Sequence, residues 1–183
     1  MTRVYMIRHG ETDWNKAHRL QGWSDIPLNE RGRAQAACAA KMMASVPLDV
    51  IYTSPLKRAV ETAEIIRGKT AVPVISEKGF IEINLGRWDG HSPEEMDELY
   101  PGQYDIWRST PGDVHIDGGE SFTAVQERAW KSFLSMTEKN RGNIYCWYPI
   151  WAVSAPSFSK SPAMGSMICG STPSETVLSA EWI

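Results

Sequence analysis

Arg8 and His9 stand side by side at the end of a short apolar run near the N-terminus, and Gly10 follows them. A neutral imidazole nitrogen can attack phosphorus to give a phosphohistidine, and a guanidinium binds phosphoryl oxygens through a planar fork. Gly10 allows a close approach of the backbone. The three residues favour a phosphate site with a nucleophilic histidine, although a histidine that stands alone after a strand is more often structural or solvated.

Two charged residues further along the chain suit the same chemistry. Arg58 falls in the first turn of a predicted helix, where the positive end of the helix dipole and unpaired N–H groups favour an anion. Glu82 lies in the apolar stretch 80–85, where desolvation raises the pKa of a carboxyl group and keeps it protonated for general-acid work. Without the His9 motif, Arg58 would be interpreted as a surface arginine paired with Glu61 or Thr62, and Glu82 as a solvated strand residue.

Taken together, the motifs resemble those of histidine phosphatases in the phosphoglycerate-mutase-like superfamily, and most of all its broad-specificity and α-ribazole-type members. The resemblance covers residues 3 to about 143. It is carried by five segments, which are Arg8–Thr12 with Trp14-Asn15, Leu20–Gly32, Ser54–Ala63, Gly79–Gly90 and Gly118–Ser121.

The resemblance implies a role for each of these motif residues. His9 would be the catalytic phosphate acceptor, and Glu82 the catalytic proton donor to the leaving oxygen. The implied phosphate and substrate ligands are Arg8, Arg58, Asn15, Gln21 and Gly22. The implied reaction is the hydrolysis of small phosphorylated metabolites through a phosphohistidine, without a metal or another cofactor. Phosphoglycerate mutase is the alternative within the family, but the chain between Arg58 and Glu82 is short and lacks the long insertion with which mutases enclose their substrate.

One part of the family pattern is missing. Family members follow a late helix with a strand that ends in a V-x-H-G-G type motif, whose second histidine binds the phosphoryl group opposite the nucleophile. The corresponding stretch here is 143–151, and no histidine follows His115. We therefore expect impaired hydrolysis. An inactive protein that only binds phosphorylated ligands is the alternative from another functional class.

The composition of the chain changes near Asn143. After it only three charged side chains remain, Lys160, Glu175 and Glu181, and the segment is rich in Ser and Pro without an amphipathic period. Such a segment is typical of a poorly ordered terminus.

A shifted reading frame would explain both the missing histidine and the change in composition. When the possible codons for residues 144–153 are read two bases out of step, they force Leu-Leu-Val after a Leu or Ile. They then permit Ser-His, followed by Leu or Met and a forced glycine. Our hypothesis is that the frame shifts near Asn143 or Ile144, so we divide the chain into an incomplete catalytic domain, 1–143, and an atypical tail, 144–183.

The elements that position these motifs alternate between strands and helices. Strands are predicted over 2–7, 49–53 and 72–76, and helices over 30–44 with Asn29 as N-cap, from Ser54-Pro55, from the capping box at Ser92, and from Ser121. This order predicts an α/β protein, a three-layer α/β/α sandwich around a mostly parallel sheet. The resemblance implies the phosphoglycerate-mutase-like form of it. The tail does not support that fold's C-terminal strand and helix.

Length and charge limit the possible partners. The chain has 183 residues, a formal net charge of -3 and an apolar share of 42%, which suits one domain with a single sizeable core. Nucleic acid and anionic membranes are not expected partners because both require a basic face, which leaves a small phosphorylated metabolite. The N-terminus has no signal-peptide pattern, so a cytoplasmic location is expected. The three cysteines, without metal-ligand spacing, are expected to be free thiols.

Overall fold

The computed structural model describes residues 2–140, 143–146, 164–168 and 176–182 of the chain. Its sheet has six strands in the order β3-β2-β4-β1-β6-β5, in which the first four are parallel to one another, β6 is antiparallel to β1, and β5 is antiparallel to β6. The strands are β1 (Thr2–Ile7), β2 (Val50–Thr53), β3 (Val74–Ser76), β4 (Asn143–Cys146), β5 (Met164–Ile168) and β6 (Thr176–Trp182). The prediction of a mostly parallel sheet is confirmed.

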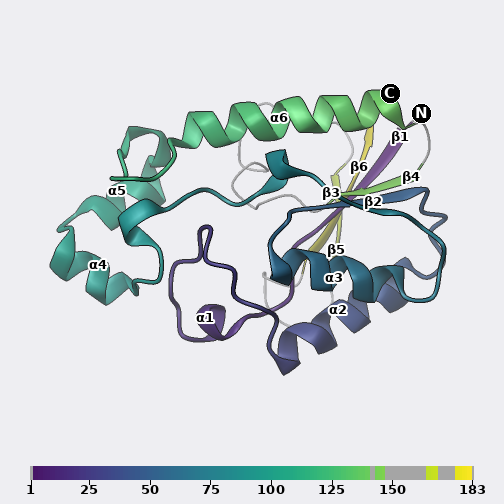
Figure 1. Ribbon diagram of the computed structural model, residues 1–183, viewed down its shortest axis with the longest axis horizontal. Helices are drawn as coiled ribbons and strands as arrows, with labels where there is room; N and C mark the ends of the chain where they lie inside the picture. The colour runs from purple at the N-terminus through teal and green to yellow at the C-terminus, as the bar shows by residue number, and fades with distance from the viewer. Residues whose placement is uncertain (1, 141–142, 147–163, 169–175, 183) are drawn as a thin grey trace.

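Helices cover both faces of this sheet. Figure 1 shows α6 along one face and α2 with α3 on the other, so the predicted three-layer sandwich is confirmed. Helices α4 and α5 lie beyond the end of the sheet, near the start of α6 (Figure 1). The α-helices are α1 (Asp13–Lys16), α2 (Glu30–Met43), α3 (Lys57–Arg67), α4 (Pro93–Leu99), α5 (Gln103–Ser109) and α6 (Phe122–Lys139), and 3-10 turns span Lys78–Phe80, Gly86–Trp88 and Pro111–Asp113.

Most helix starts follow from local capping. The side chains of Asn29 and Ser121 accept hydrogen bonds from backbone N–H groups of the first turns of α2 and α6, and Ser92 forms a full capping box at α4. The start predicted at Ser54-Pro55 is wrong. Helix α3 begins at Lys57, because Leu56 is still extended and serves as N-cap without a side-chain hydrogen bond.

Alternation along the strands divides the core between the two faces of the sheet. Val4 and Met6 of β1 pack in the cluster that includes Phe133 of α6, whereas Ile7 packs in the cluster that includes Met43 of α2. A third cluster of buried residues packs around Trp88 and contains no residue of the sheet. It includes Met96 of α4 and Trp107 of α5. It fixes the segment that follows the 3-10 turn Lys78–Phe80, which carries Glu82.

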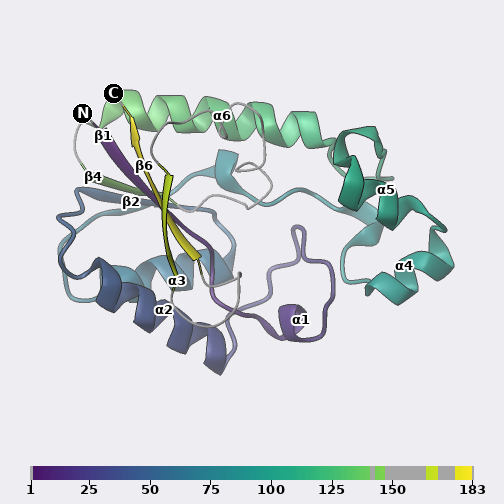
Figure 2. The same cartoon turned by 180° about the vertical axis from the view of Figure 1, so that it is seen from behind.

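The tail contributes two strands to the sheet. β6 pairs antiparallel with β1 from Thr2↔Trp182 to Ile7↔Val177, and β5 pairs antiparallel with β6. Figure 2 shows β6 alongside β1. The expectation of a poorly ordered terminus stays a prediction: the structure describes the strands β5 and β6, and the rest of 147–183 lies outside the described residues.

Two further expectations concern single features. Cys38 is disulfide-bonded, so the prediction that all three cysteines are free thiols is wrong. Within the described part of the chain, no helix is both long and apolar enough to cross a membrane.

Candidate active site

The candidate site lies where the parallel strands β1, β4 and β2 end. Strand β4 sits between the other two, so the carboxyl ends of all three strands meet at one edge of the sheet, the usual position of ligand sites in such sheets. Arg8 and His9 follow β1 directly, and Arg58 occupies the first turn of α3 beyond β2. The sheet thus brings the predicted nucleophile and both predicted phosphate-binding arginines to the same edge.

His9 is buried, with 7% of its surface exposed. Its Nδ1 lies 2.7 Å from the carbonyl oxygen of Gly10. Because a carbonyl can only accept, Nδ1 carries the proton and Nε2 the lone pair in the neutral ring. Burial holds the pKa of His9 well below its ordinary 6.5, and the charges of Arg58 and Arg8 lower it further, against a smaller opposing effect of the Gly10 hydrogen bond. The ring is therefore neutral near pH 7 and nucleophilic through Nε2.

The loop that carries His9 packs backbone to backbone against the start of α2. A Cβ added to Gly10 would lie 2.2 Å from the carbonyl oxygen of Gly32, and one added to Gly32 would lie 2.1 Å from that of Glu11. The predicted close approach at Gly10 is thus made by a helix of the protein itself. A hydrogen bond from the Gly10 N–H to Thr62 Oγ1, 3.2 Å long, ties the same loop to α3.

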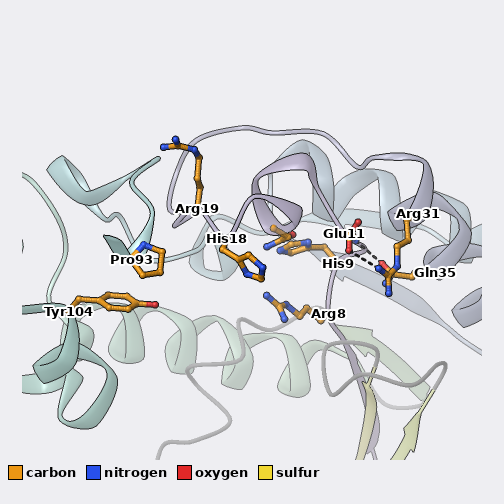
Figure 3. Close-up of a pocket in the computed structure, with 10 residues that line it drawn as sticks. Arg8, His9, Glu11, His18, Arg19, Arg31, Gln35, Pro93 and Tyr104 are labelled. Atoms are coloured by element: carbon orange, nitrogen blue, oxygen red, sulfur yellow. Dashed lines mark hydrogen bonds and ion pairs between the residues drawn. The ribbon is translucent and has the colours of Figure 1, made fainter. Parts of the chain in front are cut away.

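A cavity of about 450 Å³ opens beside His9. Figure 3 shows its lining side chains, which come from the His9 loop, from α1 and its following turn, and from the starts of α2, α4 and α5. Several are cationic, which suits a phosphorylated ligand. The lining consists of Arg8, His9, Glu11, Asn15, His18, Arg19, Arg31, Gln35, Pro93 and Tyr104.

Arg58 is almost fully buried, with 1% of its surface exposed. Its Nη1 donates to the carbonyl oxygen of Ser24 at 2.8 Å and its Nη2 to that of Gly22 at 3.0 Å. Its Nε is buried and finds no hydrogen-bond partner among the described residues. An unmatched buried N–H of a guanidinium is costly, so the site retains donor capacity for an anion at Arg58. The interpretation as a surface arginine paired with Glu61 or Thr62 is wrong, because the side chain is buried and the Thr62 hydroxyl donates to the Arg58 backbone carbonyl at 2.7 Å.

Glu82 is buried, with 8% of its surface exposed, and its Oε1 accepts a hydrogen bond from the Ile83 N–H at 3.0 Å. Burial raises the pKa of Glu82 above its ordinary 4.5, and the Ile83 hydrogen bond and the charges of Arg58, Arg8 and Arg128 oppose that rise without cancelling it. The predicted raised pKa is confirmed, and the alternative of a solvated strand residue is wrong.

The three remaining predicted ligands have different positions. Asn15 lines the cavity, and its Oδ1 accepts a hydrogen bond from the Thr12 N–H at 3.1 Å. Gln21 accepts from the Thr12 hydroxyl through Oε1 at 2.8 Å, while its Nε2 is buried without a partner among the described residues. Gly22 acts through its backbone, since its carbonyl binds Arg58 and its N–H donates to Asp89 Oδ1 at 2.9 Å.

The predicted residues therefore form one electrostatic cluster but not one surface. The charges of Arg8 and Arg58 lower the pKa of His9 and also oppose the rise in the pKa of Glu82. Of the seven predicted site residues, only Arg8, His9 and Asn15 belong to the cavity lining. Among residues whose side chains are described, no group of three or more His, Cys, Asp or Glu could hold a metal ion.

Two residues outside the predicted set hold the site in place. Arg128 of α6 donates to the carbonyl oxygens of Gly79, Ile81 and Glu82 at 2.7–3.0 Å. Asp89 accepts from the N–H groups of Gly22 and Ser24, both at 2.9 Å, on the loop that also binds Arg58. Asp89 belongs to the motif Gly79–Gly90, so the sequence identified its motif but did not predict its hydrogen bonds. The only sequence signal for Arg128 was a charged residue next to the apolar stripe of its helix.

Comparisons with known proteins agree with this architecture. The family model of the histidine phosphatase superfamily, branch 1, matches residues 4–148. The chain is 41% identical over 143 residues to phosphoserine phosphatase 1 of Hydrogenobacter thermophilus, an alignment that covers 78% of this chain and 67% of that protein. Over the first curated relatives that it matches, the chain spans about half to two thirds of their length.

Solved structures give the same result. The structure of YhfR from Bacillus stearothermophilus superposes with a TM-score of 0.83 at 31% identity, covering 93% of both chains. The α-ribazole phosphatase from Shigella flexneri gives a TM-score of 0.71 at 25% identity over 80% of this chain and 73% of that one. The fold is thus the phosphoglycerate-mutase-like one that the sequence motifs implied.

Proposed function

We infer that this chain, which belongs to branch 1 of the histidine phosphatase superfamily, hydrolyses phosphate monoesters of small metabolites through a phosphohistidine on His9. The observation that supports this most directly is the neutral, buried His9 imidazole beside Arg8 at a cavity of about 450 Å³. The names of relatives, a phosphoserine phosphatase and an α-ribazole phosphatase, favour a small phosphorylated substrate. A cytoplasmic location remains a prediction.

In the first step, Nε2 of His9 attacks phosphorus while the bond from phosphorus to the alcohol oxygen breaks. Glu82, whose raised pKa favours its protonated form, gives its proton to the leaving oxygen, so that a neutral alcohol departs. Arg8 and Arg58 stabilise the charge on the equatorial oxygens. Their positive charges also keep His9 deprotonated before attack.

In the second step, water attacks the phosphohistidine. Glu82, now a carboxylate, takes the proton of that water, and the bond from phosphorus to Nε2 breaks. Inorganic phosphate leaves and both residues return to their starting protonation states. We expect this cycle to be slow in the chain as it stands, because the second imidazole implied by the family pattern is missing from its sequence.

The test of this function is the release of inorganic phosphate by the purified chain. We expect slow release from p-nitrophenyl phosphate, phosphoserine and α-ribazole phosphate, unchanged by a metal chelator. A protein that only binds phosphorylated ligands would bind vanadate without releasing phosphate. A mutase would interconvert phosphoglycerate isomers without net release.

Replacing Arg58 with alanine should weaken vanadate binding by roughly 10- to 100-fold, because one charge-assisted, buried set of hydrogen bonds is worth about 1.5–3 kcal/mol. Arg67→Ala is the matched control, since Arg67 ends the same helix and pairs with Glu64 on its surface. Dissociation constants from calorimetry check this. Equal constants for the two variants would contradict a role of Arg58 in phosphate binding, and the melting temperature reports separately on the lost hydrogen bonds to Ser24 and Gly22.

Replacing Glu82 with glutamine should slow the cleavage of phosphoserine by about 10²- to 10⁴-fold, the usual contribution of a general acid. The loss should be much smaller with p-nitrophenyl phosphate, whose leaving group departs without protonation. In the wild-type chain, first-step rates should fall as the pH rises through the raised pKa of Glu82, and this alkaline limb should vanish in the variant. Single-turnover rates against pH measure both effects. Equal losses with the two esters would exclude Glu82 as the acid.

The same substitution should change the pH dependence of stability. Because the pKa of Glu82 is raised in the folded state, its favourable contribution is complete below the ordinary value of 4.5 and is lost as the pH rises through the raised value. Glu82→Gln should remove that loss, so that the melting temperature falls less between acidic and neutral pH. Glu98→Gln, on the exposed side of α4, is the control and should leave the profile unchanged.

A further inference from the structure

His18 occupies a backbone position that side chains rarely adopt. Helix α1 ends at Lys16 with Ala17 as C-cap. The His18 N–H then donates to the Asn15 carbonyl at 3.1 Å and the Arg19 N–H to the Trp14 carbonyl at 2.8 Å. These two bonds are those of a Schellman motif, whose left-handed residue is usually glycine. His18 has φ 54°, and it is the one non-glycine residue with positive φ in the described part of the chain.

No side-chain hydrogen bond within the described part of the protein holds His18 in this strained conformation. Histidine tolerates the left-handed region better than most residues, yet glycine would adopt it without a steric penalty. The exposed imidazole makes no hydrogen bond to a described residue, and its side chain interacts only electrostatically, with the exposed carboxylate of Glu94. A strained residue whose side chain makes no hydrogen bond to the fold is a candidate for a functional role.

The His18 side chain faces the same cavity as the nucleophile. His18 and His9 both belong to its lining, and Figure 3 shows the His18 imidazole in the space between Tyr104 and Arg8. Two arginines on the outer lining already have carboxylate partners. Arg19 binds Glu95 in a bidentate pair at 2.9 and 3.0 Å, and Arg31 lies 3.5 Å from Glu11.

We propose that His18 is a specificity-determining residue that binds the alcohol part of the substrate, donating a hydrogen bond from its imidazole to a hydroxyl or carboxylate oxygen of that part. The proposal rests on the proposed function, because it assumes that Arg8 and His9 hold the phosphoryl group. On this proposal, the left-handed conformation of His18 after α1 directs a hydrogen-bond donor into the cavity. Phosphomonoesters whose alcohol carries an oxygen acceptor are the substrate class that this site favours.

The experiment compares two non-hydrolysable ligands. Methylphosphonate fills only the phosphoryl position, whereas 2-amino-4-phosphonobutyrate, the methylene analogue of phosphoserine, adds a carboxylate. His18→Gly should weaken binding of the second ligand about tenfold, the worth of one hydrogen bond, and leave binding of the first unchanged. It should also raise the melting temperature by about 2–4 °C, because the strain at the turn is removed.

Gly118→His is the matched control for strain. Gly118 has φ 69° and open space around its Cβ position, and it is not part of the cavity lining. This variant should lower the melting temperature and leave both dissociation constants unchanged. Calorimetric titration and thermal unfolding of the full chain supply all the readouts.

Several results would overturn the proposal. If His18→Gly leaves both affinities unchanged, His18 is only a strained helix end. If it weakens both ligands equally, it acts on the phosphoryl group or on the fold, and a lower melting temperature would refute the strain. These readouts need no turnover, so a chain that releases phosphate from no ester would refute the proposed function while the two phosphonates still decide the role of His18.

Discussion

Replacing His9 with alanine should abolish both phosphate release and the acid-labile phosphoenzyme. Burial, and then the charges of Arg58 and Arg8, lower the pKa of His9, and its Nδ1 is bound to a carbonyl so that Nε2 carries the lone pair. The loss removes the nucleophile itself, so the expected effect is complete rather than partial. Labelling with a ³²P-phosphomonoester, followed by acid and base treatment, detects the phosphohistidine.

His115→Ala is the control for this experiment, because His115 is exposed and lies outside the cavity lining. It should retain the label and the wild-type rate. Turnover of the His9 variant at the wild-type rate would refute the proposed nucleophile. Label that persists in the His9 variant would assign the acceptor role to another residue, for which His18 is the nearest candidate by its place in the cavity.

Restoring the alternative reading frame after Asn143 should raise phosphatase turnover by about 10²- to 10³-fold, the typical value of one preorganised donor to the transition state. The fold gives this prediction a geometric basis. Strand β4 lies between β1 and β2 and runs parallel to both, so the chain leaves Cys146 at the same edge as His9 and Arg58. An imidazole just beyond β4 would therefore lie at the same edge of the sheet as His9 and Arg58, where it could bind the phosphoryl group.

Two chains and one control test this prediction. The chain as given and the restored chain are compared for p-nitrophenyl phosphate turnover and melting temperature, and a restored chain whose new histidine is replaced by asparagine separates the imidazole from the rest of the tail. We expect the restored chain to be faster and more stable, and the control to keep the stability but lose most of the rate. Equal rates and melting temperatures for the given and restored chains would make the present tail a genuine alternative ending and the frameshift hypothesis wrong.

The fold was predictable where local signals decide the structure. Asn29 and Ser121 cap helices as expected because a side-chain oxygen reaches the first turn without help from distant residues. The same local reasoning fails at Ser54, where packing keeps the chain extended through Leu56 before α3 begins. The strand order could not be predicted, because it depends on pairings such as Val4↔Ile144 between segments far apart in the chain. The strands β5 and β6 lie in a segment without a recognisable amphipathic pattern, so the sequence did not predict them.

The candidate site was predictable at the level of residue type and not of contact. Motif resemblance gave His9, Arg58 and Glu82, and their apolar or charged neighbours were enough to predict the raised pKa of Glu82. That Arg58 binds the carbonyl oxygens of Ser24 and Gly22 depends on a loop far from it in sequence. The roles of Arg128 and Asp89 are of the same kind, since both residues support the site by binding backbone atoms. Every residue has the same backbone groups, so the sequence does not indicate which of them a side chain will bind.

The paired glycines at positions 10 and 32 constrain how this protein can evolve. Each Cβ would collide with a carbonyl oxygen of the facing segment, so neither position can accept a side chain unless the His9 loop or helix α2 moves. The Gly10 carbonyl also orients His9, and a displacement of the nucleophile by about 1 Å can cost 10²-fold in rate. A substitution at Gly32, which takes no part in the reaction, would thus reduce activity by displacing the nucleophile, and selection would act against it.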